Sequence, residues 1–185
     1  SQYLEKYLKI KSSILEKINN FYALNMKNLN VIGVHLRNKV FIDPAYGKRI
    51  EFIKEYLSKN PTSKIFIATE SILCIDMMIK EFGDRIIYYP CNREAMADNP
   101  ELNNYNLDQL GSIKIKEHTW NGEDSIVDCV LLSKCNFLLH GHSNLTTFCL
   151  FFNPNIEHFY IQEKRHKFWK DQLTKERQRE IGYRK

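Results

Sequence analysis

The sequence lacks any apolar run of the roughly 18 to 20 residues that a membrane-spanning helix needs. It also lacks internal repeats, low-complexity segments and the Gly-x-Gly-x-x-Gly pattern of many dinucleotide-binding domains. What remains is a 185-residue chain that is 43% hydrophobic and 26% charged, as in an ordinary globular protein. These features predict a cytoplasmic protein with one main domain, and they leave open a peripheral association with an inner membrane.

Paired cysteines and metal-binding motifs are also missing. The five cysteines form no Cys-x-x-Cys pair, and their odd number predicts free thiols that are packed in the protein interior. His140 and His142 stand two residues apart, but this spacing matches no zinc signature, and the sequence has no Asp-x-Asp motif. We therefore expect no metal and no other cofactor.

The formal net charge of +5 is not spread evenly along the chain. Residues 164–185 contain nine Lys or Arg and three Asp or Glu, so the rest of the chain has 18 basic and 19 acidic side chains. A nearly neutral main domain argues against a nucleic-acid partner. The pattern instead predicts a domain over residues 1–162, followed by a basic helix or tail over residues 163–185.

Apolar runs alternate with amphipathic segments, which predicts alternating strands and helices. The predicted strands are residues 31–36, 64–69, 85–89, 137–139 and 157–162. The predicted helices are residues 3–18, 49–58 and 71–82, a segment after Gly122 that includes 126–132, and residues 144–152. Residues 91–120 have the composition of a long irregular segment. This order predicts an α/β fold, a Rossmann-like parallel sheet with helices on both faces.

The segment 122–154 has the most informative pattern in the sequence. In residues 126–132 every residue except Asp128 is apolar, which predicts a buried helix that carries one buried carboxylate. Ser143 is placed to cap a helix that starts at Asn144, directly after a short apolar strand. The free N–H groups of that helix would then face the carboxyl end of the strand, where open α/β sheets bind phosphate.

The apolar run at residues 31–36 leads into a second group of candidate residues. His35 and Arg37 stand two residues apart on a predicted strand, so their side chains project to the same face. An arginine at the carboxyl end of a strand can make a bidentate bond to a diphosphate and stabilise negative charge that develops on it. The alternatives are a surface salt bridge for Arg37, a packed ring for His35 and a structural pairing role for Asp128.

Three motifs follow one another over residues 31–154. The first is Gly33–Arg37 and the second is Ile65–Thr69. The third consists of Asp128, Leu132, Ser133, Cys135, Phe137 and Leu138, followed by Ser143 and Asn144. In this order they resemble the motifs of the fucosyltransferase superfamily, which includes α1,6- and protein O-fucosyltransferases and nodulation fucosyltransferases.

The resemblance implies the carboxyl-terminal, donor-binding half of a GT-B glycosyltransferase, with a second, amino-terminal Rossmann-like domain as its partner. It implies metal-independent, inverting transfer of a sugar to a glycan acceptor, with GDP-fucose as the leading nucleotide-sugar donor. Arg37 would be catalytic and would hold the diphosphate, and Asp128 would accept hydrogen bonds from guanine. The implied donor-binding residues are His35, Arg37, Thr69, Asp128, Ser143, Asn144 and Thr146.

The first two motifs also depart from the family's pattern. After Arg37 the chain continues with Asn-Lys-Val at residues 38–40, where the family has a second basic or small residue and an aspartate. After Thr69 the chain has Glu-Ser in place of the family's acidic pair. The alternative function is therefore a non-catalytic nucleotide-sugar-binding module that keeps the fold but has lost the transfer chemistry.

Overall fold

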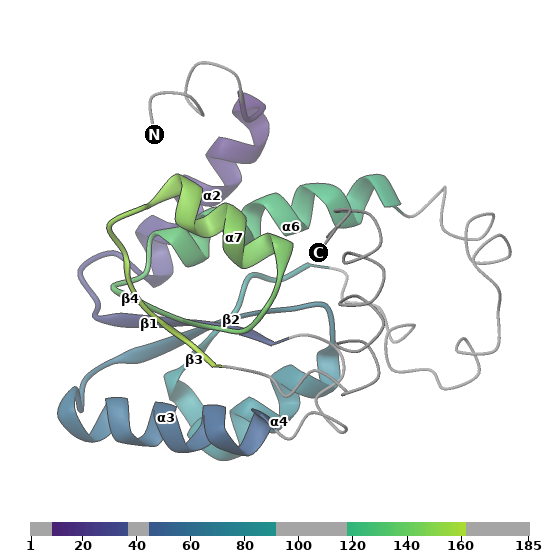
Figure 1. Cartoon of the computed structure of the whole chain (residues 1–185). Coiled ribbons are helices and arrows are strands. Elements are labelled where there is room, and N and C mark those ends of the chain that lie inside the picture. The colour runs from purple at the N-terminus through teal and green to yellow at the C-terminus, as the bar shows by residue number, and fades with distance from the viewer. Residues whose placement is uncertain (1–8, 37–44, 92–117, 162–185) are drawn as a thin grey trace, which may run out of the picture.

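A five-stranded parallel sheet forms the centre of the computed structural model, which describes residues 9–36, 45–91 and 118–161 (Figure 1). The strand order is β3-β2-β1-β4-β5. The strands are β1 (Val31–Leu36), β2 (Lys64–Thr69), β3 (Ile86–Ile87), β4 (Phe137–His140) and β5 (Glu157–Tyr160). The predicted Rossmann-like α/β fold is confirmed. The predicted tail at 163–185 and most of the predicted irregular segment lie outside the described residues.

Helices cover both faces of this sheet (Figure 1). One face carries α2 (Ser12–Asn25), α6 (His118–Ser133) and α7 (Asn144–Phe152). The other carries α3 (Ala45–Lys59) and α4 (Ile72–Phe82), which is followed by a 3₁₀ turn, Gly83–Arg85. From β1, the strands β2 and β3 are added toward one edge of the sheet, whereas β4 and β5 are added toward the other edge. Because crossovers are right-handed, this reversal also changes the face that the connecting helices cover.

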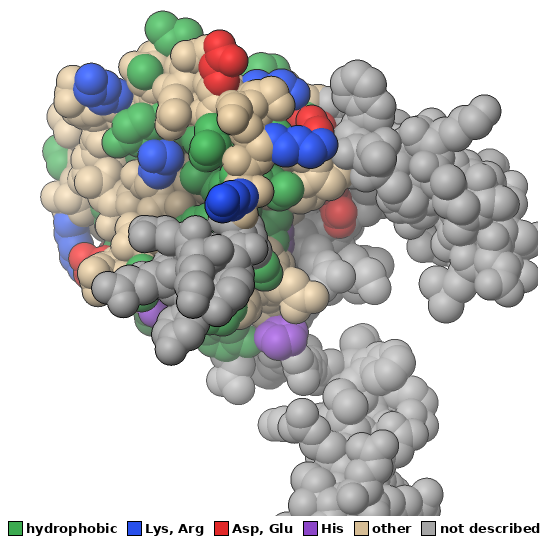
Figure 2. Space-filling view, turned by 90° about the horizontal axis from the view of Figure 1, so that it is seen from above, with side chains coloured by type: hydrophobic (Ala, Val, Ile, Leu, Met, Phe, Trp, Pro, Cys, Tyr) green, Lys and Arg blue, Asp and Glu red, His purple; other side chains and the backbone are tan. Residues whose placement is uncertain are grey.

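Side chains alternate across the sheet and form two apolar layers. The layer toward α2, α6 and α7 includes Ile18, Phe66, Leu131, Leu132 and Leu138. The layer toward α3 and α4 includes Ile32, Ile53, Ile65, Ile67 and Leu139. Burial on both faces explains why the central strands are continuous apolar runs in the sequence. On the outer side of α2, α6 and α7, Figure 2 shows charged side chains scattered among apolar ones.

The cysteines are free, and four of them are buried, as predicted from their number and spacing. The thiols of Cys129 on α6 and Cys149 on α7 lie 3.5 Å apart, so they help to join these two helices. Burial raises the pKa of the Cys135 thiol, which keeps it protonated at neutral pH. Among the described residues, no helix is long and apolar enough to cross a membrane.

Gly33 lets α6 pack closely against the middle of β1. A Cβ atom at this position would lie 2.9 Å from Sγ of Cys135 and 3.0 Å from Cδ2 of Leu132. Both distances are shorter than an ordinary carbon contact of about 3.5–4.0 Å. Glycine at position 33 therefore allows α6 to approach the sheet more closely than any larger residue would.

The first predicted helix has the wrong end. The sequence predicted a helix over residues 3–18 that stops at Asn19–Asn20, whereas the described part of this segment is helical from Ser12 to Asn25. The helix continues because its next residues, Phe21 and Tyr22, pack against the same apolar layer as Ile18. The chain turns only at Asn28, whose φ of 65° is a left-handed conformation that asparagine tolerates.

Other boundaries differ by a few residues. Strands β1 and β2 match their predictions, but the third strand is Ile86–Ile87 instead of 85–89, because Arg85 belongs to the 3₁₀ turn. The fifth strand ends at Tyr160 instead of residue 162. The second helix was predicted to begin at residue 49 but begins at Ala45, so Gly47 lies inside α3, where nothing is within 4 Å of its missing Cβ. Residues 118–120 were placed in the irregular segment but form the first turn of α6.

Candidate functional site

The candidate site lies where the strand order reverses, at the carboxyl ends of β1 and β4. In open α/β sheets the loops that leave two such strands separate and form the usual ligand-binding crevice. At this edge the chain leaves β4 through Gly141 and enters α7 at Asn144. The turn 141–144 therefore lies at the position where this fold class binds ligands.

Ser143 caps α7, as predicted from the sequence. Its side-chain oxygen accepts a hydrogen bond from the backbone N–H of Leu145 at 3.2 Å, and its carbonyl accepts one from Thr147 at 3.1 Å. Asn144 follows as the first helical residue and is exposed. The positive end of the α7 dipole therefore points toward the crevice, where it favours a negatively charged group.

Thr146 faces the protein's own backbone in this turn. Its side chain is only 1% exposed, and its hydroxyl lies 3.0 Å from the carbonyl oxygen of Ser143 and 3.3 Å from that of Gly141. A hydroxyl donates one hydrogen bond at a time, so it alternates between these two acceptors. Thr146 therefore helps to hold the turn in shape.

Asp128 is buried on α6, with 6% of its surface exposed, as predicted. It lies one helical turn before Leu132, the residue that packs on Gly33. Because α6 leads directly into β4, which is parallel to β1, the helix runs antiparallel to β1. One turn back along α6, about 5.4 Å, corresponds to about two residues forward along β1.

Asp128 and His35 therefore lie on the same side of the sheet, because His35 projects from β1 to the same face as Gly33. Both side chains take part in interactions within the protein, so neither is an isolated buried polar group. The sequence placed these two residues in different motifs. The packing of α6 on Gly33 is what brings them together.

Thr69 lies on the other face of the sheet. It is paired in register with Leu36, and its side chain points, like those of Ile65 and Ile67, toward α3 and α4. Its oxygen accepts a hydrogen bond from the N–H of Ser71 at 3.2 Å. The sheet therefore separates Thr69 from His35 and Asp128, and its described contact serves the start of α4.

Arg37, the predicted catalytic residue, lies outside the described residues. It follows Leu36, the last residue of β1, in the sequence. The last described residue before it, Leu36, ends β1, one of the two strands between which the strand order reverses.

Tyr89 is a site residue that the sequence did not single out. It lies just after β3, and its ring packs edge-on against Phe21 of α2 at a centroid distance of 5.3 Å. Burial raises the pKa of its hydroxyl, and the carboxylates of Asp124 and Asp128 raise this pKa further. Tyr89 is therefore close enough to Asp128 for the two side chains to interact.

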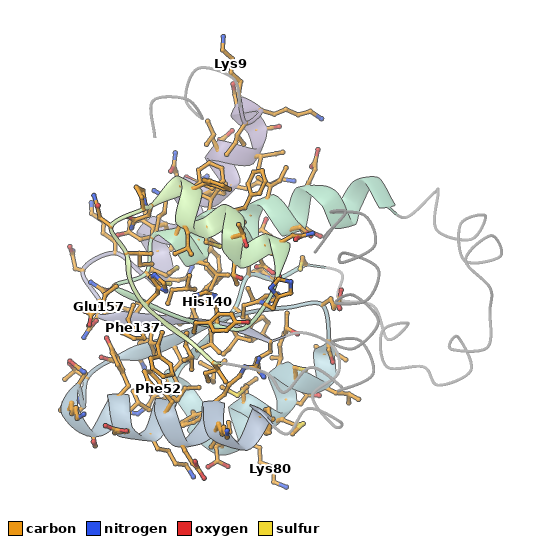
Figure 3. The ribbon with its side chains drawn as sticks, in the orientation of Figure 1. Lys9, Phe52, Lys80, Phe137, His140 and Glu157 are labelled. Atoms are coloured by element: carbon orange, nitrogen blue, oxygen red, sulfur yellow. The ribbon has the colours of Figure 1, made fainter. Side chains whose placement is uncertain are left out.

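A pair of histidines, His140 of β4 and His158 of β5, also lies beside the turn 141–144. His140 is buried and labelled in Figure 3. Its Nδ1 lies 3.2 Å from the Gly141 carbonyl oxygen, and its Nε2 lies 3.1 Å from Nδ1 of His158. Burial lowers the pKa of His140. Among the described residues, no group of three or more His, Cys, Asp or Glu side chains is arranged to hold a metal ion.

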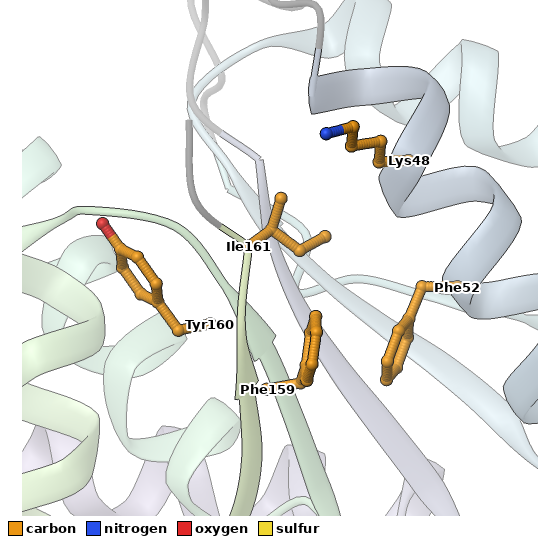
Figure 4. A pocket seen from close by; sticks show the side chains of 5 residues that line it. All are labelled: Lys48, Phe52, Phe159, Tyr160 and Ile161. Atoms are coloured by element: carbon orange, nitrogen blue, oxygen red, sulfur yellow. The ribbon is translucent and has the colours of Figure 1, made fainter. Parts of the chain in front are cut away.

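An open groove of about 260 Å³ lies on the opposite face of β5 (Figure 4). The rings of Phe52 and Phe159 are stacked at its base with a centroid distance of 4.8 Å. Lys48 and Ile161 line the groove as well, and the Ile161 N–H donates to the His140 carbonyl at 2.8 Å. Tyr160 also lines the groove, and its ring packs edge-on against His140 at a centroid distance of 5.5 Å.

Comparison with solved structures identifies the fold. The fucosyltransferase NodZ from Bradyrhizobium aligns with a TM-score of 0.55 and 17% identity, over 83% of this chain and 46% of NodZ. The NodZ α-1,6-fucosyltransferase co-crystallised with GDP gives a TM-score of 0.52 at 18% identity, over 79% of this chain and 43% of that one. This chain has a fucosyltransferase-like fold.

A second protein, POFUT1, also aligns with this chain, with a TM-score of 0.53. The identity is 14%, and the alignment covers 85% of this chain and 48% of POFUT1. No protein-family model matches the sequence, and a search of curated proteins finds no match either. The chain spans less than half the length of the fucosyltransferase structures that it matches.

Proposed function

We propose that this chain is the donor-binding half of a fucosyltransferase-like glycosyltransferase of the GT-B arrangement, with GDP-fucose as its leading donor. The observation that carries the proposal is the burial of the Asp128 carboxylate on α6, on the same side of the sheet as the capped amino terminus of α7. Two of the matching structures support the ligand class, because NodZ was co-crystallised with GDP and soaked with GDP-fucose.

In this proposal Asp128 recognises the base. Guanine presents N1–H and N2–H₂ side by side, and a carboxylate offers about four acceptor positions, so Asp128 can bind guanine and keep an interaction within the protein. Adenine and the uracil ring do not present this pair of adjacent donors to a carboxylate. His35 and the ring of Tyr89 lie on the same side of the sheet and provide further contacts for the nucleoside.

The diphosphate would bind at the turn before α7. Ser143 and Asn144 present the helix amino terminus to it, and Arg37, from the loop after β1, would add a bidentate guanidinium contact. In an inverting displacement the acceptor oxygen attacks the anomeric carbon as the bond to the diphosphate breaks. Negative charge then grows on the diphosphate, so Arg37 binds the transition state more strongly than the ground state.

Calorimetric titration with GDP, ADP and UDP tests this function. We expect GDP to bind most tightly, and Asp128→Asn to lose roughly 1–3 kcal/mol of that preference because an acceptor becomes a mismatched donor. Glu123→Gln is a matched control, because Glu123 is a half-exposed carboxylate on the same helix that pairs with Lys11 and Lys17. Equal affinity for the three nucleotides would contradict base recognition by Asp128. A strict requirement for Mg²⁺ or Mn²⁺ would contradict metal-independent chemistry.

A non-catalytic nucleotide-sugar-binding module is the second candidate function. It is favoured by the departure of residues 38–40 from the family's first motif, which removes the aspartate found there. The two candidates differ in turnover. Release of GDP from GDP-fucose in the presence of a glycan acceptor supports the enzyme, whereas GDP-fucose binding without release supports the module. This comparison needs the full-length protein, since the matching structures are about twice as long as this chain.

A further inference from the structure

The contacts of the histidine pair define which nitrogens carry protons. A carbonyl oxygen only accepts, so Nδ1 of His140 must donate to the Gly141 carbonyl 3.2 Å away. Nε2 of the neutral His140 ring is then an acceptor. Nδ1 of His158, 3.1 Å from it, must therefore be the donor. The hydrogen bonds run in one direction, from His158 through His140 to Gly141.

The Gly141 carbonyl at the end of this chain of bonds also lies 3.3 Å from the hydroxyl of Thr146, which shares its single proton with the Ser143 carbonyl at 3.0 Å. The hydrogen bond from His140 is therefore the steadier of the two that hold the Gly141 carbonyl oxygen in place. In a trans peptide the C=O and the following N–H point in opposite directions. Fixing the Gly141 carbonyl therefore turns the N–H of His142 outward, to the side from which a ligand reaches the turn.

We propose that His158 and His140 are positioning residues that hold the 141–142 peptide so that the His142 N–H faces the donor diphosphate. The inference rests on the proposed function for the nature of the ligand, but its structural part concerns the turn alone. His158 is exposed on β5 and adds little to the apolar core. Its contribution is the hydrogen bond to His140 and the orientation that this bond transmits.

Protonation of the His140 ring should uncouple the pair. The proton has to add to Nε2 of His140, and two N–H groups then face each other. The titratable groups on this side of the sheet include His158 and Tyr160 of β5, His35 of β1, Asp124 and Asp128 of α6 and Tyr89 after β3, while α7 has the Cys149 thiol but no charged residue.

Two variants of His158 test the inference. His158→Leu removes the donor and should weaken GDP binding by roughly fivefold to tenfold, as expected for one lost hydrogen bond. His158→Gln keeps an N–H donor without a titratable ring and should bind within about twofold of the unaltered chain. Glu157→Gln, a change at the neighbouring exposed residue of β5, is the control and should leave binding unchanged.

Nuclear magnetic resonance gives a readout that does not depend on GDP. We expect the Nδ1–H form of His140, and we expect His158→Leu to shift the amide resonances of residues 141–143 while His158→Gln restores them. If these resonances shift but the unaltered chain binds no GDP, the positioning role stands and the proposed function fails. If His158→Leu leaves the resonances and GDP binding unchanged, or if Gln fails to restore either one, the positioning role is refuted.

Discussion

Replacing Gly33 with alanine should destabilise the protein, although alanine normally suits a strand better than glycine does. The new methyl group would meet Cys135 Sγ at 2.9 Å and Leu132 Cδ2 at 3.0 Å. Both neighbours are buried, with 5% and 0% of their surface exposed, so they have little room to move. Overpacking of this kind costs about 1–3 kcal/mol. Loss of glycine's flexibility in the unfolded chain offsets about 0.5–1 kcal/mol, which leaves a net cost of about 1–2 kcal/mol.

Urea denaturation of three variants measures this cost. Gly47→Ala is the matched control, because this helix position has nothing within 4 Å of the added Cβ and should gain up to about 1 kcal/mol. The third variant combines Gly33→Ala with Cys135→Ala. The second change removes the Cys135 Sγ atom, which lies closest to the new methyl group at position 33. The double variant should therefore be less destabilised than the sum of its two single changes.

The same variant links packing to the site. If α6 moves outward to admit the methyl group, Asp128 moves away from His35, and the preference for GDP over UDP should decrease. A Gly33→Ala protein that is as stable as the unaltered chain would refute the close-packing argument. Additive effects of Gly33→Ala and Cys135→Ala would show that the strain lies elsewhere.

Two further predictions concern Arg37 and His140. Arg37→Ala should weaken GDP binding by about 2 kcal/mol with the melting temperature unchanged, and Arg37→Lys should recover little because a point charge makes no bidentate contact; a large fall in melting temperature would identify a structural partner instead. Burial lowers the pKa of His140, so the unfolded chain binds more protons there and stability falls as the pH drops below about 6.5. Melting temperatures from about pH 7.5 to about pH 5 should therefore decline less steeply for His140→Gln, and parallel curves for the two proteins would contradict this.

Local patterns in the sequence were enough to predict the elements and their class. β1 and β2 were predicted at their observed bounds because buried parallel strands are unbroken apolar runs. The cap at Ser143 and the burial of Asp128 also follow from neighbours within a few residues. Where prediction failed, at the end of α2 and the start of α3, neighbouring residues such as Phe21 and Tyr46 pack on the core and extend the helix.

The site itself depends on contacts between residues that are far apart in the chain. His140 and His158 belong to separate strands, and the role of Gly33 becomes clear only when Cys135 lies against it. Thr69 and His35 both lie near the carboxyl ends of neighbouring strands, yet His35 is paired with Ala68 and Thr69 with Leu36, so the two side chains point to opposite faces. The hydrophobic periodicity of a segment indicates which face of its own helix or strand a residue lies on, and this is a local property. Which elements become neighbours depends on the strand order and on how closely the helices approach the sheet, and only the folded chain determines both.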